Sequence, residues 1–234
     1  MRCGMKVARL VCLGAMIGST GCFSLGRTPP PQKHFVLGAD GGSRDATVPP
    51  VSFDITIGVR RLKLASYLAS PFMVVRRGPN QVDFAEFHRW GEPLEAGINR
   101  VVAGALLARG FREVAVAPWP ARARYDYVIQ LDVVRFEGMA PDDPDSAEGG
   151  VLLLATWEIA RQLDGSVLVR GTTDYQRPGW SVGDYPALVT LLDDGLGVLA
   201  DDLAVALAGL PPREPSTPPP SRPTHRTRAA PPAG

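Results

Sequence analysis

All three cysteines of this 234-residue chain lie within its first 22 residues. A folded body that follows them has neither disulfides nor thiolate metal ligands, so a hydrophobic core must hold it together. The cysteine-bearing segment begins with basic residues, continues with the apolar run 10–17 and ends in small residues. This order is that of a secretory signal peptide, and the apolar run is too short to span a bilayer as a helix. We therefore predict a signal peptide over residues 1–21.

The last cysteine, Cys22, follows Gly21 as in a bacterial lipobox, where the cysteine is acylated and becomes the mature N-terminus. Ser19 stands where a lipobox usually has Leu, and an ordinary secreted protein is the alternative. We predict that Cys22 carries the lipid (palmitate) and that residues 22–50, rich in Pro and Gly, tether the folded part to a membrane. Within this tether, residues 33–37 could form a short strand.

Charge and histidine content restrict the chemistry of the folded part. Residues 211–234, rich in Pro and Arg, are predicted to form a disordered tail. The formal net charge is +1, so no nucleic-acid partner is expected. Of the three histidines, His88 alone lies outside the predicted tether and tail, which leaves too few ligands for a zinc site. The sequence has no Gly-x-Ser-x-Gly elbow and no glycine-rich phosphate loop, so we predict no metal, no cofactor and no enzymatic activity.

Residues 51–210 have the pattern of one α+β domain. Helical spacing of apolar residues predicts a helix over residues 94–106 and a second one over residues 184–208, with Asp184 as its N-cap. We expect a largely antiparallel sheet with the two amphipathic helices packed on one face. Alternating or apolar runs predict strands at residues 53–59, 72–75, 81–85, 113–117, 125–136, 151–163 and 166–175.

One group of neighbouring side chains could carry chemistry. Glu86 and His88 could act as an acid–base pair. The aromatic residues around them, Phe84, Phe87 and Trp90, favour the alternative of core packing with polar groups at the surface.

Two charged patches are candidates for docking. The last predicted helix has an acidic face, which could attract a basic partner. Its members are Asp193, Asp194, Asp201 and Asp202. The basic counterparts are Arg60, Arg61, Lys63, Arg76 and Arg77. If protomers assemble into a homo-oligomeric ring, the acidic patch of one could meet the basic patch of the next.

Two segments, at residues 62–72 and 84–94, resemble those of the ABC-type transport auxiliary lipoproteins, a family that includes paraquat-inducible protein C. The family pattern is close to Pro-x-Tyr-Leu-x-x-Pro and Phe-x-x-Trp-Ala-Glu-Pro-Leu, and Ser66 and Gly91 depart from it here. The resemblance spans roughly residues 51–210 together with the lipobox. It implies structural or docking roles, and no catalytic ones, for the matching residues Tyr67, Leu68, Phe87, Trp90, Pro93 and Leu94.

The resemblance also implies a function. The protein would be a periplasm-facing docking subunit of an MCE-type system, in which an MCE-domain protein, an ABC permease and an ATPase move lipids or other hydrophobic molecules across the envelope. Phe23, rather than an Asp retention signal, follows Cys22, which implies the outer membrane. The alternatives are a periplasmic hydrolase or cell-wall enzyme that uses His88, and a free-standing ligand-binding lipoprotein.

Overall fold

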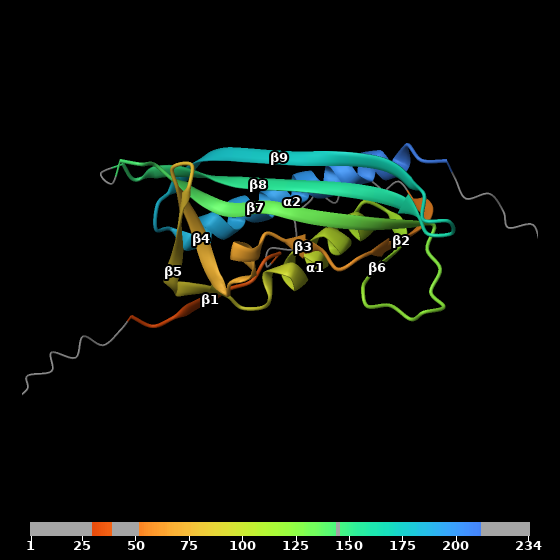
Figure 1. Ribbon diagram of the computed structural model, residues 1–234, viewed down its shortest axis with the longest axis horizontal. Helices are drawn as coiled ribbons and strands as arrows, with labels where there is room; N and C mark the ends of the chain where they lie inside the picture. The colour runs from red at the N-terminus through yellow and green to blue at the C-terminus, as the bar shows by residue number, and fades with distance from the viewer. Residues whose placement is uncertain (1–29, 39–51, 144–145, 212–234) are drawn as a thin grey trace, which may run out of the picture. The chain divides into compact units, whose positions relative to one another are not determined.

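The described structure is an α+β arrangement of one mixed sheet and two long helices (Figure 1). The computed structural model describes residues 30–38, 52–143 and 146–211. The predicted signal peptide and Cys22 lie outside these ranges, as does the predicted tail beyond Pro211. The strands are β1 (Lys33–Phe35), β2 (Phe53–Val59), β3 (Lys63–Leu64), β4 (Phe72–Arg77), β5 (Gln81–Trp90), β6 (Phe111–Val116), β7 (Tyr127–Ala140), β8 (Glu148–Arg161) and β9 (Val167–Ser181). The helices are the 3₁₀ turn η1 (Ser66–Ala69), α1 (Leu94–Ala108) and α2 (Tyr185–Ala208).

The long ladders of the sheet are antiparallel. β7 pairs with β8 from Tyr127↔Arg161 to Met139↔Gly150, and β8 pairs with β9 along almost its whole length. Gly165, at φ +73°, makes the turn between β8 and β9, where the sequence predicts a hairpin. These three strands therefore form the meander that the alternating sequence pattern indicates.

The second edge of β7 is shared by three short strands that follow one another along it. β2 pairs with its first residues, β3 with its middle and β4 with its end, and all three run parallel to β7. β6 joins β2 and β1 joins β5 in parallel, whereas β4 and β5 are antiparallel. The α+β class is thus confirmed, and the sheet is a mixed one whose shorter ladders are mostly parallel.

Both helices cover the same face of the sheet and pack against each other (Figure 1). The Asp184 carboxylate accepts a hydrogen bond from the Ala187 amide at 3.2 Å, which confirms it as the N-cap of α2. The predicted leucine stripe of α2 is buried, from Leu188 at 1% exposure to Leu207 at 0%. Among the described residues, no helix combines the length and hydrophobicity that crossing a bilayer demands.

Trp180 fixes the start of α2 against β7. Its side chain is fully buried, and its indole N–H donates to the Asp184 carbonyl at 2.8 Å. The ring lies over Gly138, where a Cβ atom would come within 2.8 Å of it. A side chain at position 138 would therefore displace the indole and with it the first turn of α2.

The segment around β1 is built into the domain, although it lies within the range predicted as a tether. Leu37, 1% exposed, packs beside Gly97 of α1. The Gly38 amide, at φ +66°, donates to both carboxylate oxygens of Asp193 in α2 at 2.9 Å. Arg100 of α1 donates to the Leu37 carbonyl at 3.0 Å. The chain is therefore held by β5 and by both helices before it leaves the described range after Gly38. A separate unit, Met1–Pro31, precedes it.

Candidate docking site

The two family-like segments meet in the middle of the molecule, where η1 and the start of α1 lie beside β3. Together they line an open depression with a cavity volume of about 400 Å³. Residues 69–71 form one side, residues 90–95 form the other, and Leu64 of β3 contributes to the wall. A hydrogen bond from the Trp90 amide to the Pro71 carbonyl, 2.8 Å long, joins the two sides. Segments that are some 20 residues apart in sequence thus form a single surface feature.

Three of the six family-motif residues form the support of this depression. Leu68, Trp90 and Leu94 are 1%, 7% and 5% exposed and belong to the hydrophobic core. The Trp90 ring lies 6.0 Å from that of Phe136 on β7, centroid to centroid. Because these three side chains pack in the core beneath the depression, they hold the exposed residues of its rim in place.

The other three motif residues are accessible to different degrees. Pro93 is exposed, and its carbonyl accepts the first α1 hydrogen bonds, from the amides of Ala96 and Gly97. Phe87 is half-buried on β5, outside the depression. Tyr67 is half-buried on η1, and its hydroxyl donates to the Val134 carbonyl at 3.2 Å. The structure therefore brings the motif together as a scaffold, with Pro93 as its accessible member at the rim.

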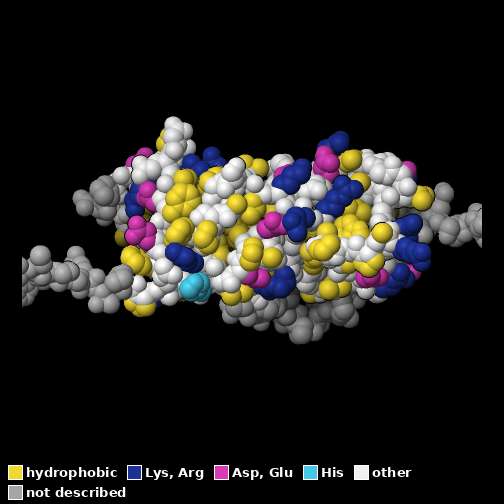
Figure 2. Space-filling view, turned by 60° about the horizontal axis from the view of Figure 1, so that its bottom comes forward, with side chains coloured by type: hydrophobic (Ala, Val, Ile, Leu, Met, Phe, Trp, Pro, Cys, Tyr) yellow, Lys and Arg dark blue, Asp and Glu magenta, His cyan; other side chains and the backbone are white. Residues whose placement is uncertain are grey.

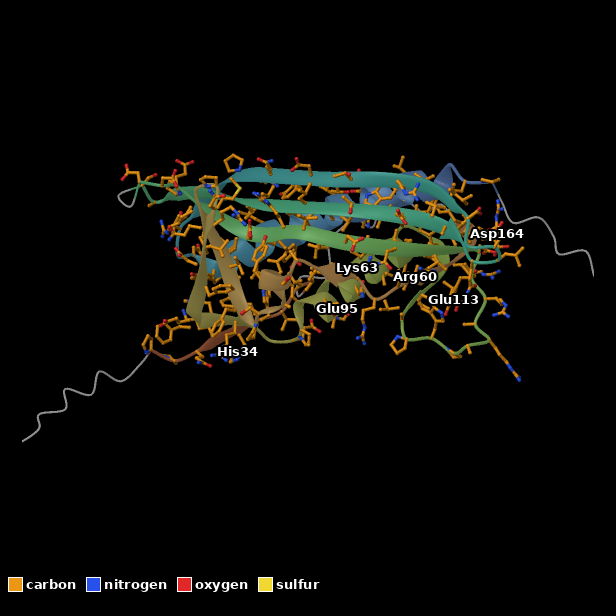
Figure 3. All side chains as sticks on the ribbon, in the orientation of Figure 1. His34, Arg60, Lys63, Glu95, Glu113 and Asp164 are labelled. Atoms are coloured by element: carbon orange, nitrogen blue, oxygen red, sulfur yellow. The ribbon has the colours of Figure 1, made fainter. Side chains whose placement is uncertain are left out.

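Charged side chains surround the depression in opposite pairs. Figure 2 shows cationic side chains placed among hydrophobic ones along the face that it presents. Figure 3 labels Lys63 and Glu95, both in the middle part of the view. Glu95 pairs with Arg61 at 3.3 Å, and the rim residue Glu92 pairs with Arg100. The rim is thus polar and close to neutral in total charge.

A buried ion pair stands behind η1, and the sequence pattern alone did not reveal it. Glu137 of β7 is fully buried, and its carboxylate accepts from the Arg76 guanidinium at 2.5 Å. The same guanidinium lies 5.9 Å from the centre of the Tyr67 ring. Burial, together with the Glu137 carboxylate, raises the pKa of Tyr67 to about 12. The cluster joins η1 to β4 and β7.

The candidate acid–base pair does not assemble in the described structure. The His88 ring stacks on Tyr185 of α2 at 3.8 Å and on Phe35 of β1 at 6.0 Å. Burial and the charge of Lys33 lower the pKa of His88. Glu86 is exposed, and no hydrogen bond joins it to His88 among the described residues. In the same ranges, no three His, Cys, Asp or Glu side chains are placed to hold a metal ion.

The acidic face of α2 is engaged within the molecule. Each of its aspartates contacts another part of the domain, so the face ties α2 down, and the side chains of Asp194 and Asp201 are 50% and 56% exposed. Asp193 accepts from the Gly38 amide, Asp194 pairs with Arg177 at 3.2 Å, Asp201 pairs with Arg109 at 2.7 Å, and Asp202 accepts from the Thr173 hydroxyl at 2.6 Å. Four of the five residues of the predicted basic patch are paired: Arg61 with Glu95, Lys63 with Asp132, Arg76 with Glu137 and Arg77 with Asp83.

Comparison with known proteins gives the same family as the sequence motifs. Residues 39–204 match the family described as ABC-type transport auxiliary lipoprotein component. Protein XCC0632 from Xanthomonas campestris has a similar structure, with 19% identity and a TM-score of 0.56, over 74% of this chain and 90% of that one. A second, uncharacterized protein is similar with 16% identity and a TM-score of 0.53, over 76% and 99%. At these identities the two likenesses concern the fold. A comparison with curated proteins gave no match.

Proposed function

The chain belongs to the ABC-type transport auxiliary lipoprotein family, and on this premise we propose that it docks an MCE-domain protein to a membrane. In this role it is a non-enzymatic subunit of a system that also contains an ABC permease and an ATPase, and that moves lipids or other hydrophobic molecules across the envelope. The observation that carries the proposal is the convergence of both family-motif segments on one open depression.

The anchor in this proposal is the acylated Cys22. Several fatty chains on one cysteine hold a protein on a membrane durably, whereas a single chain binds only marginally. Phe23 follows Cys22, and by the sorting rule for lipoproteins this favours the outer membrane, with the domain facing the periplasm. Metabolic labelling with palmitate tests the anchor: we expect label on the wild-type protein and none on Cys22→Ser. An unlabelled wild-type protein would overturn it.

The depression suits a protein partner better than a small molecule. It is open, and small or rigid residues such as Ala69, Pro71 and Pro93 are exposed around its buried floor. The salt bridges formed by Glu92 and Glu95 lie at its rim. A weakly charged centre with a polar rim is the anatomy of protein–protein interfaces, where a protruding apolar side chain of the partner fills the hollow.

Co-purification of the MCE-domain protein with the intact lipoprotein tests the docking site. Ala69→Arg places a long cation in the hollow and should reduce the recovered MCE protein at least about tenfold, because it blocks contact and buries an unpaired charge. Ala108→Arg, at the other end of α1 and also exposed, is the matched control and should leave recovery unchanged. Equal recovery with both variants would refute this site, and failure of the wild-type protein to recover any MCE protein would refute the function.

The hydrolase alternative has a direct test of its own. The stacked His88 ring has no carboxylate partner among the described residues, so the proposal assigns it to packing against Tyr185. His88→Ala should therefore leave MCE binding intact. Hydrolytic turnover of a cell-wall or ester substrate that disappears in His88→Ala would favour the enzyme instead.

A further inference from the structure

We propose that the end of the domain formed by β1 and the β4–β5 hairpin rests on the phospholipid leaflet that holds the acyl chains of Cys22. We call this end the anchor-side surface, and it comprises Lys33, His34, Val36, Phe72, Phe84 and Arg89. The inference rests on the proposed acylation of Cys22 and adds to it the side of the domain that faces the membrane.

The length of chain between the lipid and the fold limits where the domain can stand. Residues 23–32, ten in number, separate Cys22 from the first residue of β1. Ten residues span at most about 35 Å, even fully extended. The strand β9, with 15 residues, spans roughly 50 Å, so the domain is longer than the connection. The connection therefore keeps the β1 end within about 35 Å of the membrane, whereas the β8–β9 turn can stand farther away.

The connection cannot gain length by releasing β1 at low cost. β1 pairs with β5 over three residues, and the next residues hold Leu37 in the core and the Gly38 amide on Asp193. Release would expose a buried leucine and break both hydrogen bonds from the Gly38 amide to the half-buried Asp193 carboxylate. The ten-residue limit therefore applies to the folded protein.

The side chains at this end suit a membrane interface. His34 of β1, Arg89 of β5 and Phe72 of β4 are cross-strand neighbours, so they share one face of the sheet. The Arg89 guanidinium lies 4.4 Å from the centre of the Phe72 ring. On the same end, Val36 is 47% exposed and Phe84 is 43% exposed. Figure 2 shows hydrophobic side chains at the left of the view beside acidic and basic ones, and Figure 3 labels His34 towards the same end. Aromatic residues beside cations are typical of the headgroup region.

Charge supports a phospholipid leaflet as the occupant. The stretch from Phe23 to His34 contains Arg27 and Lys33 and no carboxylate. Asp83, next to Phe84 in the sequence, is paired with Arg77 at 2.9 Å, whereas Glu86 is exposed and lines the same hollow as Phe72 and Phe84. Anionic lipids attract such juxtamembrane cations over a distance of about one Debye length.

Fluorescence quenching on the full, acylated protein in vesicles of phosphatidylethanolamine and phosphatidylglycerol tests this orientation. No cysteine follows Cys22, so Val36→Cys provides one thiol for an environment-sensitive dye. The matched probe is Leu163→Cys, 90% exposed beside the β8–β9 turn. Spin-labelled lipids should quench the dye at position 36 at least about threefold more than the dye at position 163. Adding Phe84→Glu should reduce that difference, whereas Thr172→Glu, exposed on β9, should not.

Each outcome separates this inference from the proposed anchor. If the wild-type protein does not float with the vesicles, the lipid anchor is wrong and the orientation falls with it. If the protein floats but both dyes are quenched equally, or neither is quenched, the anchor stands and the orientation is overturned. Stronger quenching at position 36 that persists with Phe84→Glu and disappears when the anionic lipid is omitted would keep the orientation and assign it to the cations.

Discussion

Replacing Leu37 by alanine tests whether the segment after β1 belongs to the fold. The side chain is 1% exposed and lies against Gly97 of α1. Leu→Ala removes three carbons, which corresponds to roughly 2.4 kcal/mol of lost burial, and the cavity left behind brings the total to about 3 kcal/mol. In a domain of this size that is a decrease of roughly 6–12 °C in the unfolding temperature. Val36→Ala, one residue earlier and 47% exposed, should change it by no more than about 2 °C.

The assay is thermal unfolding, followed by circular dichroism, of a soluble form in which Cys22 is replaced by serine. Urea unfolding of the same three proteins gives the free-energy difference directly, and the urea dependence of the unfolding free energy should stay constant. If Leu37→Ala unfolds at the same temperature as Val36→Ala, Leu37 is not part of the cooperative core. The connection to Cys22 would then be much longer than ten residues, and the orientation argued from its length would lose its basis.

Three further predictions concern the interior. Gly138→Ala should destabilise the domain by about 1–3 kcal/mol, because its Cβ would meet the Trp180 ring at 2.8 Å. Gly104→Ala, with no atom within 4 Å on the exposed side of α1, should instead stabilise it by up to about 1 kcal/mol. Urea unfolding of both variants checks this, and equal effects would refute it. Arg76→Met should lower the free energy of unfolding by about 3–5 kcal/mol, because it leaves the buried Glu137 carboxylate without Arg76. Adding Glu137→Met should recover most of that free energy. A double variant as unstable as Arg76→Met alone would contradict this. Folding raises the pKa of Tyr67 from 10.0 to about 12, so between these pH values the folded protein keeps a proton that the unfolded chain releases. The contribution of this group to the free energy of unfolding is therefore complete below pH 10 and lost as the pH rises towards 12. Tyr67→Phe should lose less stability over that range, and identical pH profiles of the two proteins would contradict this.

Local features of the structure follow from neighbouring residues and were predictable. Asp184 caps α2 because its carboxylate reaches an amide three residues later. The leucine stripe of α2 and the turn at Gly165 likewise depend on periodicities and turn preferences within a few positions. The predicted strand at residues 81–85 was too short, because β5 continues to Trp90 where β1 pairs with it from outside. Trp90 packs as predicted, whereas His88, expected among the polar groups at the surface, stacks on the ring of Tyr185.

The acidic face of α2 shows where sequence reasoning stopped. The sequence places four aspartates on α2, and this helix has no basic residue of its own. That pattern suggested an acidic surface that a partner could contact. Their partners come from other elements, such as Gly38, 155 positions away from Asp193, and Arg109, 92 positions away from Asp201. Sequence spacing describes which face of a helix a residue occupies, but not which distant segment lies opposite that face.

The sequence by itself determined the existence and type of most elements, the burial of the α2 leucines and, through its motifs, the family. Periodicity, caps and turns are properties of short stretches, and family motifs are read in the linear chain. The tertiary structure alone decided that three short strands share one edge of β7, that Leu37 enters the core, and that the motif segments surround one depression. These features depend on contacts between remote segments, whose formation is settled by the packing of the whole domain at once.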